Sequence, residues 1–188
     1  IDPKALSMLT DHLGTDIAKI SNEIRKLTVS LPEGTQRITD ADIEANIGIS
    51  KDYNNFELCK AVATRDMARA LMIAEHFARN PKDNPLLVTV LALFGQFKEL
   101  FVVNYLRWLS RHKGTAFPPD TELMRILKKS NVYVIGEIKQ NAANWDNRRV
   151  FNILGLLREY DAKSKGMNAG GASDGELLRE LLLKIFML

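Results

Sequence analysis

Basic side chains gather in the second half of the chain, where they could neutralise phosphates. The candidates for contact with a nucleic-acid backbone are Arg107, Arg111, Lys113, Lys128 and Lys129. Such residues release counterions from phosphates and so provide affinity that does not depend on base sequence. The alternative is an ordinary solvated surface, because the helix macrodipole favours lysine and arginine near helix ends. A helical DNA-binding module that uses the basic residues of 107–149 is therefore kept as the alternative function.

Other kinds of site find little support in the residue types. The three histidines, His12, His76 and His112, are scattered, and none has a partner at metal-ligand spacing. The glycine-rich residues 166–171 lack the spacing of a phosphate-binding loop. We predict no catalytic residue, no metal site and no cofactor, and hence no enzyme. Cys59 is the single cysteine, which favours a reducing, cytoplasmic setting.

One segment, residues 85–109, is long enough to cross a membrane. It carries Gln96, Lys98 and Glu99 near its middle. Each charged residue there would oppose insertion by about 2.5–3.5 kcal/mol. We therefore expect the central helix of a soluble domain and no membrane partner.

Helical periodicity runs through nearly the whole sequence and predicts an all-α fold. The chain has only 11 glycines and 6 prolines, which is low for a protein made of strands and turns. Capping signals mark several helix starts. We expect Asp146 to cap one helix, Ser173 and Glu176 to form a capping box, and Asn84 to cap a long helix that begins at Pro85.

The pattern divides the chain into two modules, residues 1–50 and 51–188. Three helices fill the first module, and residues 49–54 are polar and unpatterned, as expected of a joint about which the modules pivot. Charge changes at the same place, because residues 1–48 carry 5 basic and 8 acidic groups whereas residues 49–188 carry 21 and 15. Such a difference indicates modules with different neighbours.

Apolar spacing predicts which side chains are buried. Ile17 is expected on the buried face of the second helix. Aromatic residues of the long helix lie on one broad stripe that we interpret as packing, namely Phe94, Phe97, Phe101, Tyr105 and Trp108. Trp145 lies at a helix boundary, where core packing and an exposed contact are both open. As candidates for contact with a partner protein we take Trp145, Arg148 and Arg149.

Two parts of the sequence resemble a known family. Residues 13–27 (LGTDIAKISNEIRKL), followed by residues 38–44 (ITDADIE), are similar to the helical lid of an AAA+ module. More narrowly, they resemble the delta subunit of the bacterial DNA polymerase III clamp loader. Residues 156–166 (LLREYDAKSKG) resemble a late helix of the same family. The resemblance extends over the whole chain, with the lid first and a carboxy-terminal collar after it.

The resemblance implies a scaffold in a replication machine. Five related subunits of this family form a ring that is held mainly by their collars, so the collar here would pack against other loader subunits. The sliding clamp would be bound only by an amino-terminal domain that precedes Ile1, and the chain is expected to be a fragment. DNA would be reached indirectly, through the complex, whose parent enzyme is a nucleotidyltransferase.

One position departs from the wider AAA+ pattern. Relatives that hydrolyse ATP carry an arginine shortly after the glycine of the lid, where it reaches the nucleotide phosphates. Here the third position after Gly14 is Ile17, and the nearest basic residue is Lys19. The departure implies a lid that does not contact the phosphates of ATP.

Overall fold

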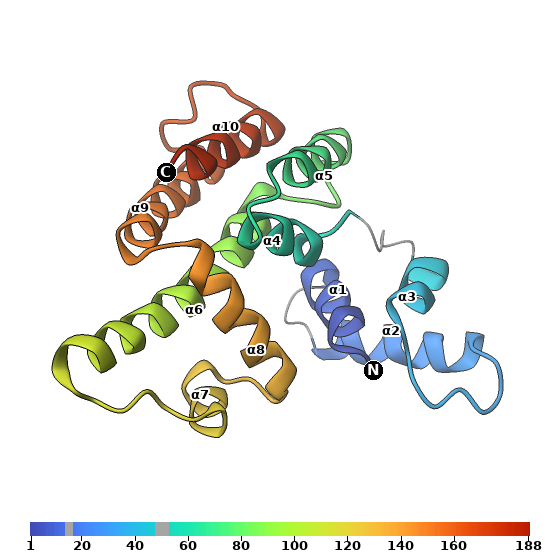
Figure 1. The fold of residues 1–188 in the computed structure, drawn as a ribbon. Helices are drawn as coiled ribbons and strands as arrows, with labels where there is room; N and C mark the ends of the chain where they lie inside the picture. The colour runs from blue at the N-terminus through green and yellow to red at the C-terminus, as the bar shows by residue number, and fades with distance from the viewer. Residues whose placement is uncertain (14–16, 48–52) are drawn as a thin grey trace.

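Helices joined by loops make up the part of the chain that the structure describes. This computed structural model describes residues 1–13, 17–47 and 53–188, with residues 11 and 12 described by their backbone alone (Figure 1). Its regular elements within these ranges are helices, and no strand occurs there. The all-α prediction is confirmed.

The first three helices enclose a small core. They are α1 (Pro3–Leu13), α2 (Ile17–Ser30) and α3 (Asp40–Ile47). The buried side chains between them are Ala5, Met8, Leu9, Leu27 and Ile43. The backbone N–H and hydroxyl of Thr39 both donate to the Asp42 carboxylate, which fixes the start of α3. These helices lie together on one side of the molecule (Figure 1).

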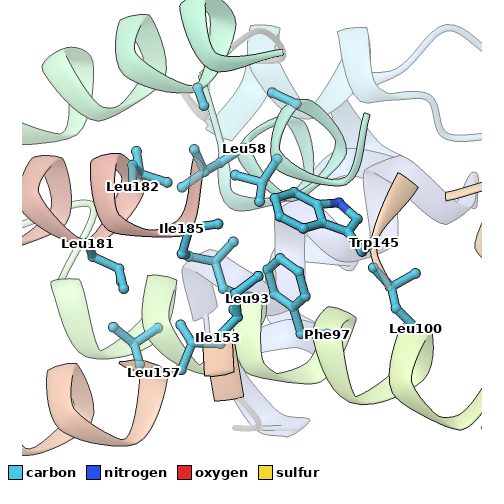
Figure 2. Close-up of a cluster of buried hydrophobic side chains, with 14 of the residues drawn as sticks. Leu58, Leu93, Phe97, Leu100, Trp145, Ile153, Leu157, Leu181, Leu182 and Ile185 are labelled. Carbon is cyan, nitrogen blue, oxygen red and sulfur yellow. The ribbon is translucent and has the colours of Figure 1, made fainter. Parts of the chain in front are cut away.

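The remaining helices share a second, larger core. They are α4 (Asn55–Ala63), α5 (Met67–Arg79), α6 (Leu86–Lys113), α7 (Asp120–Leu127), α8 (Val132–Asn141), the 3-10 helix η1 (Ala142–Asn144), α9 (Asn147–Ser164) and α10 (Asp174–Met187). The long helix α6 packs most extensively against α9, and α10 packs against α5. Figure 2 shows where side chains from these helices meet, with Phe97 of α6, Ile153 of α9 and Ile185 of α10 pointing toward one another.

An ion-pair bridge connects the two groups of helices. The Lys4 ammonium on α1 lies 3.1 Å from the Asp40 carboxylate of α3 and 3.0 Å from the Glu57 carboxylate of α4. The hydrogen bond from Lys4 lowers the pKa of Asp40. The predicted boundary between residues 50 and 51 falls within residues 48–52, and most of the predicted joint at 49–54 does so too. Both lie outside the described residues, so the division into domains stays a prediction.

Ile17 corrects the prediction made for α2. Its side chain is 82% exposed, whereas Leu27 on the same helix is fully buried. Leu27 packs with residues of α1 and α3 in the small core, and Ile17 at the helix start does not belong to that core. The residue is therefore an exposed apolar side chain and not a core one.

Side-chain caps confirm two of the predicted helix starts. Ser173 accepts a hydrogen bond from the Glu176 backbone, while the Glu176 carboxylate accepts one from the Ser173 backbone, which completes the capping box of α10. Asp146 accepts from the backbone N–H of Arg149 at the start of α9, with 2.9 Å between the two atoms. Each cap satisfies an N–H group that the helix itself leaves without a partner.

The start of α6 differs from the prediction. Pro85 precedes the first helical residue and no neighbouring side chain caps the helix; Asn84 instead donates to the carbonyl of Asn80. The cap comes from α10, where the Asp174 carboxylate accepts a hydrogen bond of 3.1 Å from the backbone N–H of Leu86. The carboxylate also lies in the first turn of its own helix, where negative charge is favourable.

Replacing Asp174 by alanine is expected to lower the free energy of unfolding by about 1–2 kcal/mol, because the α6 cap and a favourable charge are lost together. Urea titration followed by far-UV circular dichroism measures the change. Asp83→Ala, which removes an exposed carboxylate that caps neither helix, is the matched control. A loss no larger than that of the control would show that Asp174 does not cap α6.

Candidate basic and aromatic interface

Two of the predicted basic residues lie together in a hollow at the carboxyl end of α6. Arg107 and Arg111 are one helical turn apart and line a cavity of about 360 Å³, together with Trp108, His112 and Asn147 at the start of α9. Arg107 is half-buried, and its Nη2 donates a 2.7 Å hydrogen bond to the carbonyl of Lys139. Burial and the charge of Arg111 lower the pKa of Arg107. The hollow therefore has a positive potential to which both guanidinium groups contribute.

The basic residues at the start of α9 have different surroundings. Arg149 Nε lies 3.3 Å from a carboxylate oxygen of Asp146, the residue that caps the helix. Arg148 is exposed and makes no ion pair with the described residues. Asp146 also lines the hollow beside Arg107. The structure thus brings the start of α9 close to Arg107 and Arg111, with one carboxylate among them.

The remaining predicted basic residues do not join this hollow. Lys113 is exposed at the last residue of α6, and Lys128 is exposed at the end of α7, where its backbone is left-handed with φ 53°. Lys129 forms a 2.6 Å ion pair with Glu99 and lines a second groove, of about 680 Å³, between α4, α6 and α8. Because Glu99 compensates its charge, Lys129 is a weak candidate for a phosphate contact.

Trp145 corrects the prediction of an exposed contact. Its side chain is completely buried, and its indole Nε1 donates a 3.1 Å hydrogen bond to the carbonyl of Ala63. The ring meets Phe97 edge to face, with 5.4 Å between the ring centres (Figure 2). The Arg65 guanidinium lies 4.3 Å from the centre of the Trp145 ring. A large apolar ring with one N–H donor is stable inside when that donor is satisfied. Its position in the sequence left both core packing and an exposed contact open, and in the structure Trp145 packs in the core.

The aromatic residues of α6 divide between the core and the surface. Phe97 is buried, as predicted, but Phe94 is 42%, Tyr105 46% and Trp108 41% exposed. Tyr105 and Trp108 stack with 6.2 Å between ring centres, and Trp108 and His112 stack with 5.1 Å. The prediction that all five aromatic residues of α6 serve in packing was therefore wrong for these three residues. The three- and four-residue spacing of the five aromatic residues is visible in the sequence, but it does not reveal which helix face is covered.

The described residues contain no group of three histidine, cysteine, aspartate or glutamate side chains that could hold a metal ion. The His76 ring stacks on Tyr53 with 4.6 Å between centres, and Cys59 packs half-buried against the larger core. The side chain of His12 lies outside the described residues.

Within the described ranges, α6 is also the helix whose length and composition would allow it to cross a membrane, with a mean hydropathy of 1.9 over its most apolar 18 residues. In the structure it is the central helix of the larger core, packed against α4, α8 and α9. Core burial accounts for the apolar residues on one face of the helix, which include Leu93, Phe97 and Leu100.

Comparison with known proteins gives a likeness in fold. No protein-family model matches the chain, and no curated protein matches its sequence. Among solved structures, the chain is similar to the Bacillus subtilis DNA clamp loader delta protein YqeN, with 19% sequence identity and a TM-score of 0.58. The match covers 98% of this chain and 50% of that protein, so the chain spans half the length of its structural neighbour. The likeness shows that this chain folds like half of a clamp loader delta protein.

Proposed function

We propose that the chain is an assembly module of a bacterial clamp loader, equivalent to the lid and collar of the delta subunit. Residues 1–50 are assigned to an AAA+ lid, and residues 51–188 to a collar that packs against other loader subunits. The observation that carries the proposal is the likeness to the delta protein over 98% of the chain, which includes both hydrophobic cores. The sequence resemblance in residues 13–27, 38–44 and 156–166 supports the same assignment.

The proposal assigns no chemical step to this chain. ATP hydrolysis belongs to other subunits, and Ile17 occupies the lid position where hydrolysing relatives carry an arginine. Contact with the sliding clamp is assigned to the half of the delta protein that this chain does not match. The complex would act in the cytoplasm alongside the nucleotidyltransferase of the replication machine, and the chain would reach DNA through that complex.

Co-elution with the other loader subunits of the same bacterium tests this proposal. The chain should shift to a higher mass on size-exclusion chromatography when each subunit is added in turn, and at least one stable complex is expected. Bovine serum albumin at the same concentration controls for non-specific association. If no loader subunit alters the elution of the chain, the proposal is wrong.

Direct contact with DNA is the second candidate, and the hollow at Arg107 and Arg111 favours it. Burial and the charge of Arg111 lower the pKa of Arg107, and Arg111 has no carboxylate within ion-pair distance among the described residues. A phosphate would relieve this repulsion. Fluorescence anisotropy with a labelled oligonucleotide between about 50 and 200 mM salt distinguishes the candidates, because direct binding falls steeply with salt. A pure assembly module should show little affinity at either concentration.

A further inference from the structure

Seven residues of α6 repeat with strict three- and four-residue spacing along one line of the helix. We call them the α6 stripe, and they are Leu91, Phe94, Lys98, Phe101, Tyr105, Trp108 and His112. This spacing is the a and d pattern of a heptad repeat, continued over three heptads. At 1.5 Å per residue the stripe is about 32 Å long. In a coiled coil, a seam with this heptad period is covered by a second helix.

Six of the seven stripe residues are exposed, although most of the stripe is apolar, while Phe101 is partly buried against the larger core. Leu91 is 56% exposed, and Phe94, Tyr105 and Trp108 are each more than 40% exposed. The rings of Phe101, Tyr105 and Trp108 are nearly parallel to their neighbours, so they form a continuous ridge. The core-facing side of α6 carries different residues, including Leu93, Phe97 and Leu100, which are buried. Exposed apolar surface of this extent marks an interaction site.

Charge along the stripe indicates what kind of helix would cover it. The stripe contains Lys98 and His112 and no carboxylate, and Arg111 lies at its edge. Neither Lys98 nor Arg111 forms an ion pair within the described parts of the chain, whereas the nearby Glu99 is already paired with Lys129. A single lysine at an a position specifies register in a coiled coil. The matching partner is therefore acidic opposite Lys98 and Arg111.

Gly95 follows Leu91 by one helical turn, and both residues line the groove between α4, α6 and α8, where a glycine would allow a second backbone to approach closely. A side chain added there would meet nothing within 4 Å in this chain. Glycine in the middle of a helix is less stable than alanine by about 0.5–1 kcal/mol, so the residue weakens α6 without relieving any contact in the isolated chain. A partner helix that covers Leu91 and enters this groove would account for the missing side chain.

From these observations we propose that the α6 stripe docks an amphipathic helix with acidic flanking residues, supplied by a neighbouring loader subunit. This inference rests on the proposed assembly function and identifies the surface that performs it. A second copy of the chain fits less well, since it would bring the same positive residues to the interface. A nucleic acid also fits less well, because the amino-terminal half of the stripe offers one cation among Leu91, Phe94 and Phe101.

Charge insertion into the stripe of the full chain tests the inference. Leu91→Glu and Tyr105→Glu each place a carboxylate in the seam, and Phe151→Glu, which alters a 68% exposed aromatic on α9, is the matched control. The dissociation constant for the loader subunit that co-elutes with the wild type is measured by isothermal titration calorimetry. Both stripe variants should bind about tenfold or more weakly, as expected for the centre of an interface, while the control should stay within about twofold.

A glycine variant keeps the test decisive if a carboxylate variant does not fold. Gly95→Leu adds a side chain to open space at the edge of the stripe, and Gly155→Leu does the same on α9. Both should keep the wild-type circular dichroism spectrum, and Gly95→Leu alone should weaken partner binding. Normal binding by all stripe variants would overturn the inference while leaving the assembly function intact.

Two other results would also overturn the inference. One is a wild-type dimer, detected by sedimentation, that Leu91→Glu dissociates, because the occupant would then be a second copy. The other is loss of oligonucleotide binding by the stripe variants with partner binding unchanged, because the occupant would then be a nucleic acid. If the wild type binds no loader subunit at all, the result contradicts the proposed assembly function itself, and with it the inference about the stripe.

Discussion

Replacing Trp145 by alanine is expected to destabilise the chain by about 3–5 kcal/mol, the range for deleting a large aromatic side chain from a core. The ring is completely buried and packs edge to face against Phe97. Its removal leaves a cavity between η1, α4 and α6 and takes away the hydrogen bond to the Ala63 carbonyl. Because single domains are stable by only about 5–15 kcal/mol, this is a large part of the total.

Urea denaturation followed by circular dichroism measures this loss as a lower midpoint. Trp108→Ala is the matched control, because that side chain is 41% exposed, and it should lower stability by less than about 1 kcal/mol. Trp145→Phe separates the contribution of the hydrogen bond from that of ring packing, since it retains most of the ring and removes the N–H donor. Loss of the hydrogen bond is expected to lower the free energy of unfolding by about 1 kcal/mol. If Trp145→Ala is no less stable than Trp108→Ala, Trp145 does not belong to the core.

Replacing Gly175 by alanine is expected to destabilise the chain by about 1–3 kcal/mol through overpacking. A Cβ at this position of α10 would lie 2.5 Å from the Cβ and 3.0 Å from the Cα of Ala78 on α5. Neither atom is at the end of a flexible side chain, so one of the two helices must shift. The change is measured as the shift in the midpoint of urea unfolding.

Gly95→Ala is the matched control, and it is expected to change the free energy of unfolding in the opposite direction. A Cβ there meets nothing within 4 Å, so the better helix propensity of alanine should stabilise the chain by about 0.5–1 kcal/mol. The double variant Ala78→Gly with Gly175→Ala removes the clashing Cβ and should recover part of the loss, which a double-mutant cycle quantifies. Equal effects of alanine at positions 95 and 175 would show that α5 and α10 do not approach at Gly175.

Helix starts were predictable where the cap lies beside the helix in the sequence. Asp146 and the pair of Ser173 and Glu176 make the predicted hydrogen bonds, because a capping side chain within three residues needs no distant element to place it. The start of α6 was not predictable in this way. Its cap is Asp174, 88 residues away, and only the packing of α10 brings that carboxylate to the Leu86 N–H.

The candidate interface was predictable in its residue types and not in its arrangement. Arg107 and Arg111 lie together because they are one turn apart on the same helix. Lys129 belongs to the same run of basic residues, but the packing of α6 places it against Glu99. Sequence proximity thus grouped residues whose charges the fold separates.

The direction of each apolar face was decided by tertiary structure, as Ile17 and Trp145 show. Ile17 follows the helical period of α2 and is exposed, whereas Trp145 lies at a helix boundary and is buried. By itself the sequence determined that the chain is all-α, where many helices begin, and which residues share a helix face. Only the tertiary structure decided which face of α6 is covered and which carries the open stripe. The physical reason is that helical periodicity arises from hydrogen bonds within one turn, while burial depends on neighbours far away in the chain.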